Sequence, residues 1–134
     1  MAKKSWKEKF YVKSDHEIKT TQKSFWGFDS GSKMLIPSPT LIQSYINQSE
    51  VGQSLSVQTM RKDLAMEHGA DFTCPMTTGI FLRIVAEYNY HKLENNNIQS
   101  ICPFWRIIEP GSKLYEKLSF DNNFIIRKRT EEEI

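Results

Sequence analysis

The sequence has few cysteines, no long apolar run and no strong excess of one charge. Two cysteines, Cys74 and Cys102, are too few for a disulfide framework. No apolar stretch reaches the length of a membrane span, and the charged residues 1–9 are not followed by the apolar segment of a secretory signal. Eighteen basic and sixteen acidic residues give a net charge of +2. These absences predict a cytoplasmic protein that binds no membrane.

Residues suited to metal binding or nucleophilic chemistry are also sparse. The five cysteines and histidines show no paired ligand spacing, so we expect neither a metal site nor a cofactor. They are Cys74, Cys102, His16, His68 and His91. Cys74 lies at the start of a predicted helix, where capping is a simpler interpretation than catalysis. Cys102 lies among apolar and aromatic residues, which is typical of a buried, unreactive thiol.

The composition is that of one folded domain, with 134 residues, 39% of them hydrophobic and 12% aromatic. The charge is unevenly distributed. Residues 1–33 contain eight lysines and four acidic residues, whereas residues 34–112 contain five basic and seven acidic residues. We therefore predict a basic, aromatic arm over residues 1–33 that wraps a main domain over residues 34–134.

Capping signals and apolar spacing predict the helices. Ser38 before Pro39 marks the start of the first helix of the main domain. A second helix is expected from Ser56 to a stop at Gly69, and a third from about Pro75 to Lys92. The pair on either side of Gly69 predicts a helix-turn-helix.

The pattern changes after the third helix. Residues 98–108 are rich in strand-forming residues, residues 109–112 suggest a turn, and residues 113–118 could be a partner strand. Residues 124–126 are compatible with a strand or a helix, and we favour a helix. The expected fold is mainly α with a small β wing, a helix-turn-helix or winged-helix-like domain.

The third predicted helix contains groups that could contact DNA. Hydroxyls of Thr77 and Thr78 lie near its start, Arg83 follows, and Lys62 lies on the preceding helix. Helix N-termini and such side chains bind phosphates. The alternative is that these are ordinary solvated residues, because residues 56–94 contain four basic and five acidic residues and form no basic stripe.

Four separated motifs occur in a recognisable order. They are Lys4-Ser5-Trp6-Lys7-Glu8-Lys9, Ile36-Pro37-Ser38-Pro39, residues 68–81, and Pro103-Phe104-Trp105-Arg106-Ile107-Ile108. With them, residues 36–117 resemble the C-terminal winged-helix domain of alkylguanine-DNA alkyltransferases and alkyltransferase-like proteins. The likeness is greatest to a bacterial subgroup of that family. It implies a helix-turn-helix that binds DNA in the minor groove and a pocket for a flipped guanine.

The resemblance also implies that this chain is not an enzyme. The family's nucleophile is the cysteine of a Pro-Cys-His-Arg motif, and here Phe104 and Trp105 stand at the positions of the cysteine and histidine. The family's intercalating arginine falls at Gly79, and its nucleotide-rotating tyrosine falls at about Val57. Phe104 and Trp105 are expected to plug the pocket.

The interpretation is therefore a non-catalytic, alkyltransferase-like protein that binds double-stranded DNA, with damaged or alkylated DNA as a possible target. The expected DNA contacts are Lys62, Thr77, Thr78, Arg83 and Arg106, and the expected pocket residues are Val57, Phe104 and Trp105. Arg106 could instead be structural. The alternative is a protein–protein interaction module that has lost nucleic-acid binding. Lysines 3, 4, 7 and 9 beside the third helix would favour DNA, and lysines opposite it would favour a protein partner.

Overall fold

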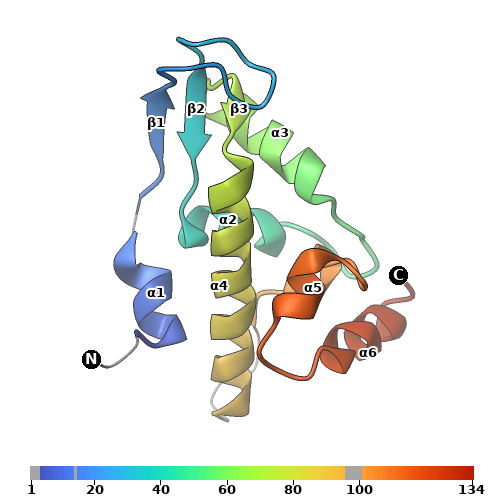
Figure 1. The fold of residues 1–134 in the computed structure, drawn as a ribbon. Coiled ribbons are helices and arrows are strands. Elements are labelled where there is room, and N and C mark those ends of the chain that lie inside the picture. Colours follow the sequence, from blue (N-terminus) through green and yellow to red (C-terminus); the bar gives the residue numbers. More distant parts are fainter. Residues whose placement is uncertain (1–3, 14, 96–100) are drawn as a thin grey trace.

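The computed structural model describes residues 4–13, 15–95 and 101–134. This part of the chain is about half helical, with a small three-stranded sheet at one end (Figure 1). Its elements are α1 (Trp6–Val12), β1 (Glu17–Thr20), β2 (Lys33–Ile36), α2 (Pro39–Asn47), α3 (Val57–Glu67), β3 (Phe72–Thr73), α4 (Pro75–Glu94), the 3-10 helix η1 (Phe104–Arg106), α5 (Lys113–Lys117) and α6 (Asn123–Glu131).

The helix predictions from capping residues are confirmed. Ser38 Oγ accepts a hydrogen bond from the Leu41 amide at 3.2 Å, and Pro39 begins α2. Ser56 caps α3 in the same way. Gly69 follows the end of α3 with a φ of +68°, a left-handed conformation that favours glycine. The C-terminal segment forms α6, so the favoured helical alternative is correct.

The predicted position of the β wing is wrong. The sheet is built from β1, antiparallel to β2, and from β3, parallel to β2, so it uses residues of the expected arm. Residues 113–117 form α5 instead of a strand, because Ser112 Oγ accepts from the Tyr115 amide and caps a helix. Phe104–Arg106 form η1, and residues 98–100 lie outside the described part.

The connection between α3 and α4 is longer than the predicted short turn. It contains β3. The residues on either side of β3 form hydrogen bonds with β2: the Asp71 amide donates to Lys33 O at 2.8 Å, and the Cys74 amide donates to Leu35 O at 2.9 Å. The start of α4 is therefore fixed by the sheet. Lys33, the last residue of the expected arm, is the first residue of β2.

The core surrounds α4, which runs along the length of the molecule and contacts both α1 and α2 (Figure 1). Several large side chains from separate elements are buried together. They include Phe10, Ile42, Ile46, Leu64, Leu82, Val85, Phe104, Ile108 and Ile125. α6 packs against η1 and contributes Phe124 and Ile125 to this core. Within the described ranges, no helix combines the length and apolarity needed to cross a bilayer.

Candidate nucleic-acid interface

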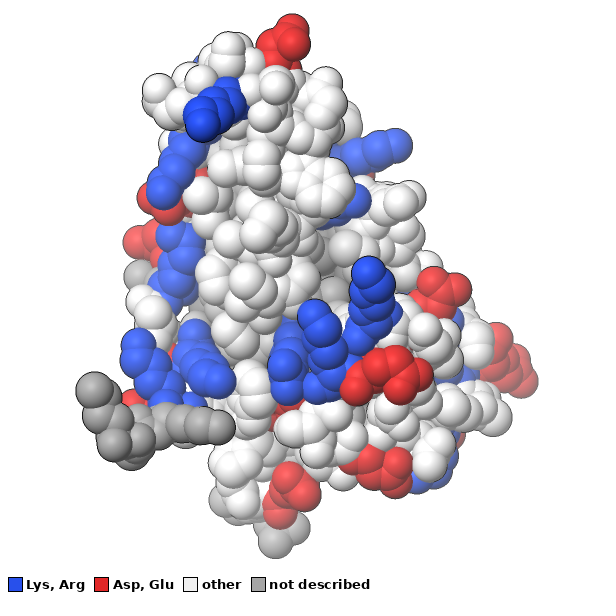
Figure 2. Space-filling view, viewed as in Figure 1, with Lys and Arg blue, Asp and Glu red and all other residues white. Residues whose placement is uncertain are grey.

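Basic side chains from three elements meet at one groove beside the first half of α4. The groove has a volume of about 530 Å³ and is bordered by α1, α4 and α5. Its cationic lining residues are Lys9, Arg83, Lys113 and Lys117. Figure 2 shows basic side chains in a band across this face, from α1 to α5, below an uncharged surface over the start of α4. We call these four residues and the groove they line the basic groove.

The sequence of α1 explains how it reaches the groove. Ser5 and Glu8 form a reciprocal capping box that fixes the start of the helix. Phe10 is buried against Tyr88 of α4, with ring centroids 4.7 Å apart. Two cations lie over the Trp6 ring, with Lys9 Nζ 4.3 Å and Arg83 Cζ 5.4 Å from its centroid. Trp6 thus contacts both cations, and all three residues line the same groove.

The first turns of α4 are partly open to solvent. Met76, Gly79 and Ile80 are exposed and line the basic groove, while Thr77 is half-buried. Thr78 does not fit its predicted role. Its side chain is buried, and its hydroxyl donates to Cys74 O at 2.6 Å, which satisfies it within the helix. Thr78 therefore offers no group to a ligand.

Arg83 lies at the groove but is held by a buried acid. Its Nε is 3.3 Å from Glu87 Oε2. Glu87 also accepts hydrogen bonds from the amide of Ser119, at 2.8 Å, and from its hydroxyl. About a third of the Arg83 side chain is exposed. The guanidinium is thus oriented by Glu87, and part of its charge is offset.

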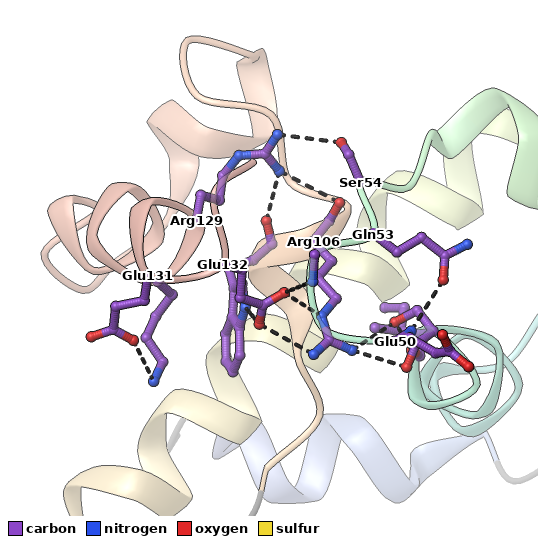
Figure 3. Close-up of polar contacts among 12 residues, drawn as sticks. Glu50, Gln53, Ser54, Arg106, Arg129, Glu131 and Glu132 are labelled. Carbon is purple, nitrogen blue, oxygen red and sulfur yellow. Dashed lines mark hydrogen bonds and ion pairs between the residues drawn. The ribbon is translucent and has the colours of Figure 1, made fainter.

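Arg106 is part of the interior, which corrects its prediction as a DNA contact. Its guanidinium donates to Glu132 Oε1 at 2.8 Å and to the backbone oxygen of Ser49 at 3.0 Å (Figure 3). Trp105 Nε1 donates to the same Glu132 carboxylate at 2.7 Å. The hydrogen bonds of Arg106 are therefore directed inward, and its role is structural.

The predicted pocket residues do not meet at one cavity. Phe104 is completely buried, with its ring 5.8 Å from that of Phe124, and Trp105 is buried beside it. Val57 lines a separate hollow of about 520 Å³ with Leu55, Ile107 and other residues. Phe104 and Trp105 do not line that hollow. The two aromatic side chains fill core volume instead.

Lys62 lies apart from the basic groove. It is exposed on α3 and lines another groove, next to Arg61, Trp26 and Met66. Pro75 lines this second groove and Met76 lines the basic groove, so the two grooves lie on different sides of the first turn of α4.

The sulfur and histidine chemistry of the described residues is limited. Both cysteines are buried. Burial raises the pKa of the Cys102 thiol to about 12, although Lys92 and Arg106 oppose this shift. The rings of His16 and His68 pack with centroids 4.2 Å apart. Among the residues described, no group of three or more His, Cys, Asp or Glu side chains could hold a metal ion.

The sequence interpretation missed Lys113, Lys117 and Trp6 as members of the site. The two lysines are four residues apart, a spacing that places them on one face of a helix. In the strand expected over residues 113–118, this spacing has no such meaning, so the two lysines were not assigned to the site. Comparisons with family models, curated proteins and solved structures give no match to this chain.

Proposed function

We propose that this protein is a non-catalytic DNA-binding module of the alkyltransferase-like type, which binds double-stranded DNA through the basic groove. The observation that supports this function is the convergence of Lys9, Arg83, Lys113 and Lys117 around the exposed first turns of α4. Phosphate neutralisation by such side chains supplies most sequence-independent affinity for DNA. In this proposal α3 and α4 are the helix pair of a winged-helix-like domain.

The position of the N-terminal lysines supports DNA over a protein partner. Lys4 precedes α1, Lys7 and Lys9 belong to it, and α1 packs against α4. Lys9 lines the basic groove directly. Lys3 lies outside the described residues. Cations from α1 and α5 therefore flank α4 on two sides, an arrangement suited to the phosphates on either side of a DNA groove.

The contact set differs from the one expected from the sequence. We retain Arg83. Thr77 is half-buried, its hydroxyl donates to Cys74 O at 3.5 Å and it does not line the basic groove, so we retain it only as a contact at the edge of the exposed turns. We add Lys9, Lys113 and Lys117, and we omit Thr78 and Arg106 because their polar groups are bonded inside the protein. Lys62 lies outside the basic groove, so it would contact the DNA only if a strand continued past the start of α4.

The buried thiols support a binding function without alkyl transfer. A nucleophilic cysteine needs an accessible thiolate and a nearby base. Cys102 is buried with its pKa raised to about 12, and its sulfur is 3.9 Å from the Gln43 carbonyl oxygen. Recognition of an alkylated guanine would use the hollow beside Val57, because Phe104 and Trp105 occupy core volume.

A protein partner is the second candidate, favoured by two exposed apolar side chains at the same groove. Met76 is 61% and Ile80 is 57% exposed. Apolar side chains of this kind form the centre of protein interfaces. The two functions are distinguished by the response of binding to salt and to charge reversal.

The test is fluorescence anisotropy with two labelled duplexes, one plain and one containing an O6-alkylguanine, at about 50 and 200 mM salt. Four groove cations predict that affinity falls on the order of 100-fold across that range. The double variant Lys113→Glu/Lys117→Glu should bind both duplexes more than about 10-fold more weakly at low salt. Lys23→Glu/Arg127→Glu is the control matched in charge, since both residues are exposed and neither lines the groove.

Each outcome separates the candidates. Equal, salt-sensitive binding to both duplexes supports a general DNA-binding module, and preference for the alkylated duplex supports lesion recognition. Absence of binding at 50 mM salt would reject the DNA function and favour the protein partner. Equal loss of affinity in Lys23→Glu/Arg127→Glu would mean that net charge, and not the basic groove, determines binding.

A further inference from the structure

A tryptophan occupies the tip of a tight turn, Phe25–Phe28, within the connection from β1 to β2. This position in such a turn normally favours other residues. The backbone of Phe25 and Phe28 is paired by two hydrogen bonds of 2.8 and 2.9 Å. The residues between them, Trp26 and Gly27, have φ angles of +52° and +83°. Turns with two positive φ values favour asparagine, aspartate or glycine at the first central position. Trp26 therefore occupies a strained position, which points to a role for its side chain.

The phenylalanines hold the turn in place, while the tryptophan stays exposed. Phe28 stacks on Phe72 of β3, with centroids 4.4 Å apart and planes within 9°. The Phe25 ring also lies near Phe72, at 6.1 Å. Trp26 is 60% exposed and makes a ring contact with Phe25 at 6.0 Å. The turn is anchored to the sheet by its flanking residues, and the Trp26 ring is left free on one side.

The exposed ring borders a groove that combines apolar walls with positive charge. The groove has a volume of about 380 Å³, and its apolar lining includes Trp26, Phe28, Met66 and Phe72. Arg61 and Lys62 line it too, and neither takes part in an ion pair among the described residues. Its one acidic lining residue, Asp71, accepts a hydrogen bond from the Lys33 amide at 2.7 Å.

We propose that this groove binds an unpaired nucleobase of a DNA strand, with Trp26 stacking on the base and Arg61 and Lys62 contacting its phosphates. Aromatic rings beside cations are the usual means of binding unstacked bases. Pro75 lines this groove and its neighbour Met76 lines the basic groove, so a strand that crosses the start of α4 would contact both. The proposal rests on the proposed function, because it assigns a second contact to the same bound DNA.

The test uses the full chain and three labelled probes: a paired duplex, the same duplex with one unpaired base, and a single strand. Stacking of one base predicts that the bulged duplex binds about 5- to 100-fold more tightly than the paired duplex. Trp26→Asn should remove this preference and leave binding to the paired duplex unchanged. Asparagine suits the turn, so the variant should unfold at the same temperature as the parent or higher. Trp26→Phe, which keeps a ring, should retain part of the preference.

The outcomes distinguish this inference from the proposed function. If the paired duplex binds but the bulge adds nothing, or if Trp26→Asn keeps the preference, the stacking site is rejected and the basic groove is not. If the protein binds none of the three probes, both proposals are rejected, and the groove beside Trp26 becomes a candidate protein-binding surface. Lys113→Glu/Lys117→Glu should weaken binding to the paired and bulged duplexes alike.

Discussion

Arg106 Nε lies 2.8 Å from Glu132 Oε1, and this buried ion pair joins η1 to the C-terminal end of α6. The same carboxylate accepts hydrogen bonds from Trp105 Nε1 at 2.7 Å and from the Gly52 amide at 3.0 Å. Arg129 reinforces the connection by donating to Trp105 O at 2.8 Å (Figure 3). One acidic residue near the end of the chain thus satisfies donors from two distant segments.

We expect Glu132→Gln to destabilise the protein by about 2–4 kcal/mol, because it leaves the Arg106 charge buried without its counter-ion. The free energy of unfolding from urea titration measures this effect. Glu131→Gln is the neighbouring control: Glu131 is 65% exposed and pairs with Lys128 at the surface, so its loss should change stability by less than about 0.5 kcal/mol. Similar values for the two variants would contradict the structural role of Glu132.

The same carboxylate predicts a loss of stability in acid. Burial raises the pKa of Glu132, but hydrogen bonds from Arg106, Gly52 and Trp105 outweigh it and lower the pKa to about 2. An unfolded glutamate has a pKa of about 4.3. Because the folded value is the lower one, the stabilisation is complete above about pH 5 and is lost as the pH falls toward 2.

Urea titrations at pH 7, 4 and 3 on the parent and on Glu132→Gln test this dependence. Other carboxylates titrate in both proteins, so the difference between the two curves isolates Glu132. We expect the difference to shrink as the pH falls. A difference that stays constant from pH 7 to pH 3 would show that Glu132 has an ordinary pKa in the folded protein.

The helices around the core could be predicted from the sequence because their signals are local. Ser38 with Pro39, and Ser56 with Gly69, mark helix ends within a few residues. The sheet could not be predicted in the same way. All four residues of β1 are exposed, so the strand lacks the alternation that half-burial produces, and β3 has only two residues.

The candidate site could be predicted only in part, because contacts between segments that are far apart in the sequence form it. Residues 104–108 are all buried, and a short run of apolar residues around Arg106 is equally compatible with a strand or a tight helix. Arg106 and Glu132 are 26 residues apart, so nothing in the sequence shows that Arg106 is paired. The acidic end of the chain has the appearance of a solvated tail. Only the tertiary structure shows that Lys113 and Lys117 border the same groove as Lys9.

We expect both thiols to be unreactive in the folded protein. Cys74 and Cys102 are buried, which keeps reagents away from both sulfurs. The pKa of Cys102 is also raised to about 12, so Cys102 carries little thiolate at neutral pH. Ellman's reagent should react at least about 10-fold faster after unfolding in urea than before. Incubation with a duplex containing O6-alkylguanine should leave the protein's mass unchanged. A gain of one alkyl group would overturn the non-catalytic interpretation.

Gly79 offers a gain-of-function test of the DNA proposal. It is exposed in α4 at the basic groove, and an added Cβ would meet no atom within 4 Å. Replacing a glycine inside a helix should therefore stabilise the protein, by about 0.5–1 kcal/mol for Gly79→Ala. Gly79→Arg should be similarly stable and should add one cation to the exposed turns of α4 at the basic groove.

For Gly79→Arg we expect duplex affinity at 50 mM salt to rise and the slope of log affinity against log salt to steepen by about one. Gly79→Ala is the control for helix stability. It should gain the same helix stability without the positive charge, so it should bind the duplex as the parent does. Anisotropy titrations at several salt concentrations measure both quantities. If Gly79→Arg folds as stably as Gly79→Ala and still binds no more tightly than the parent, the exposed turns of α4 do not face the DNA, and the proposed contact surface is wrong.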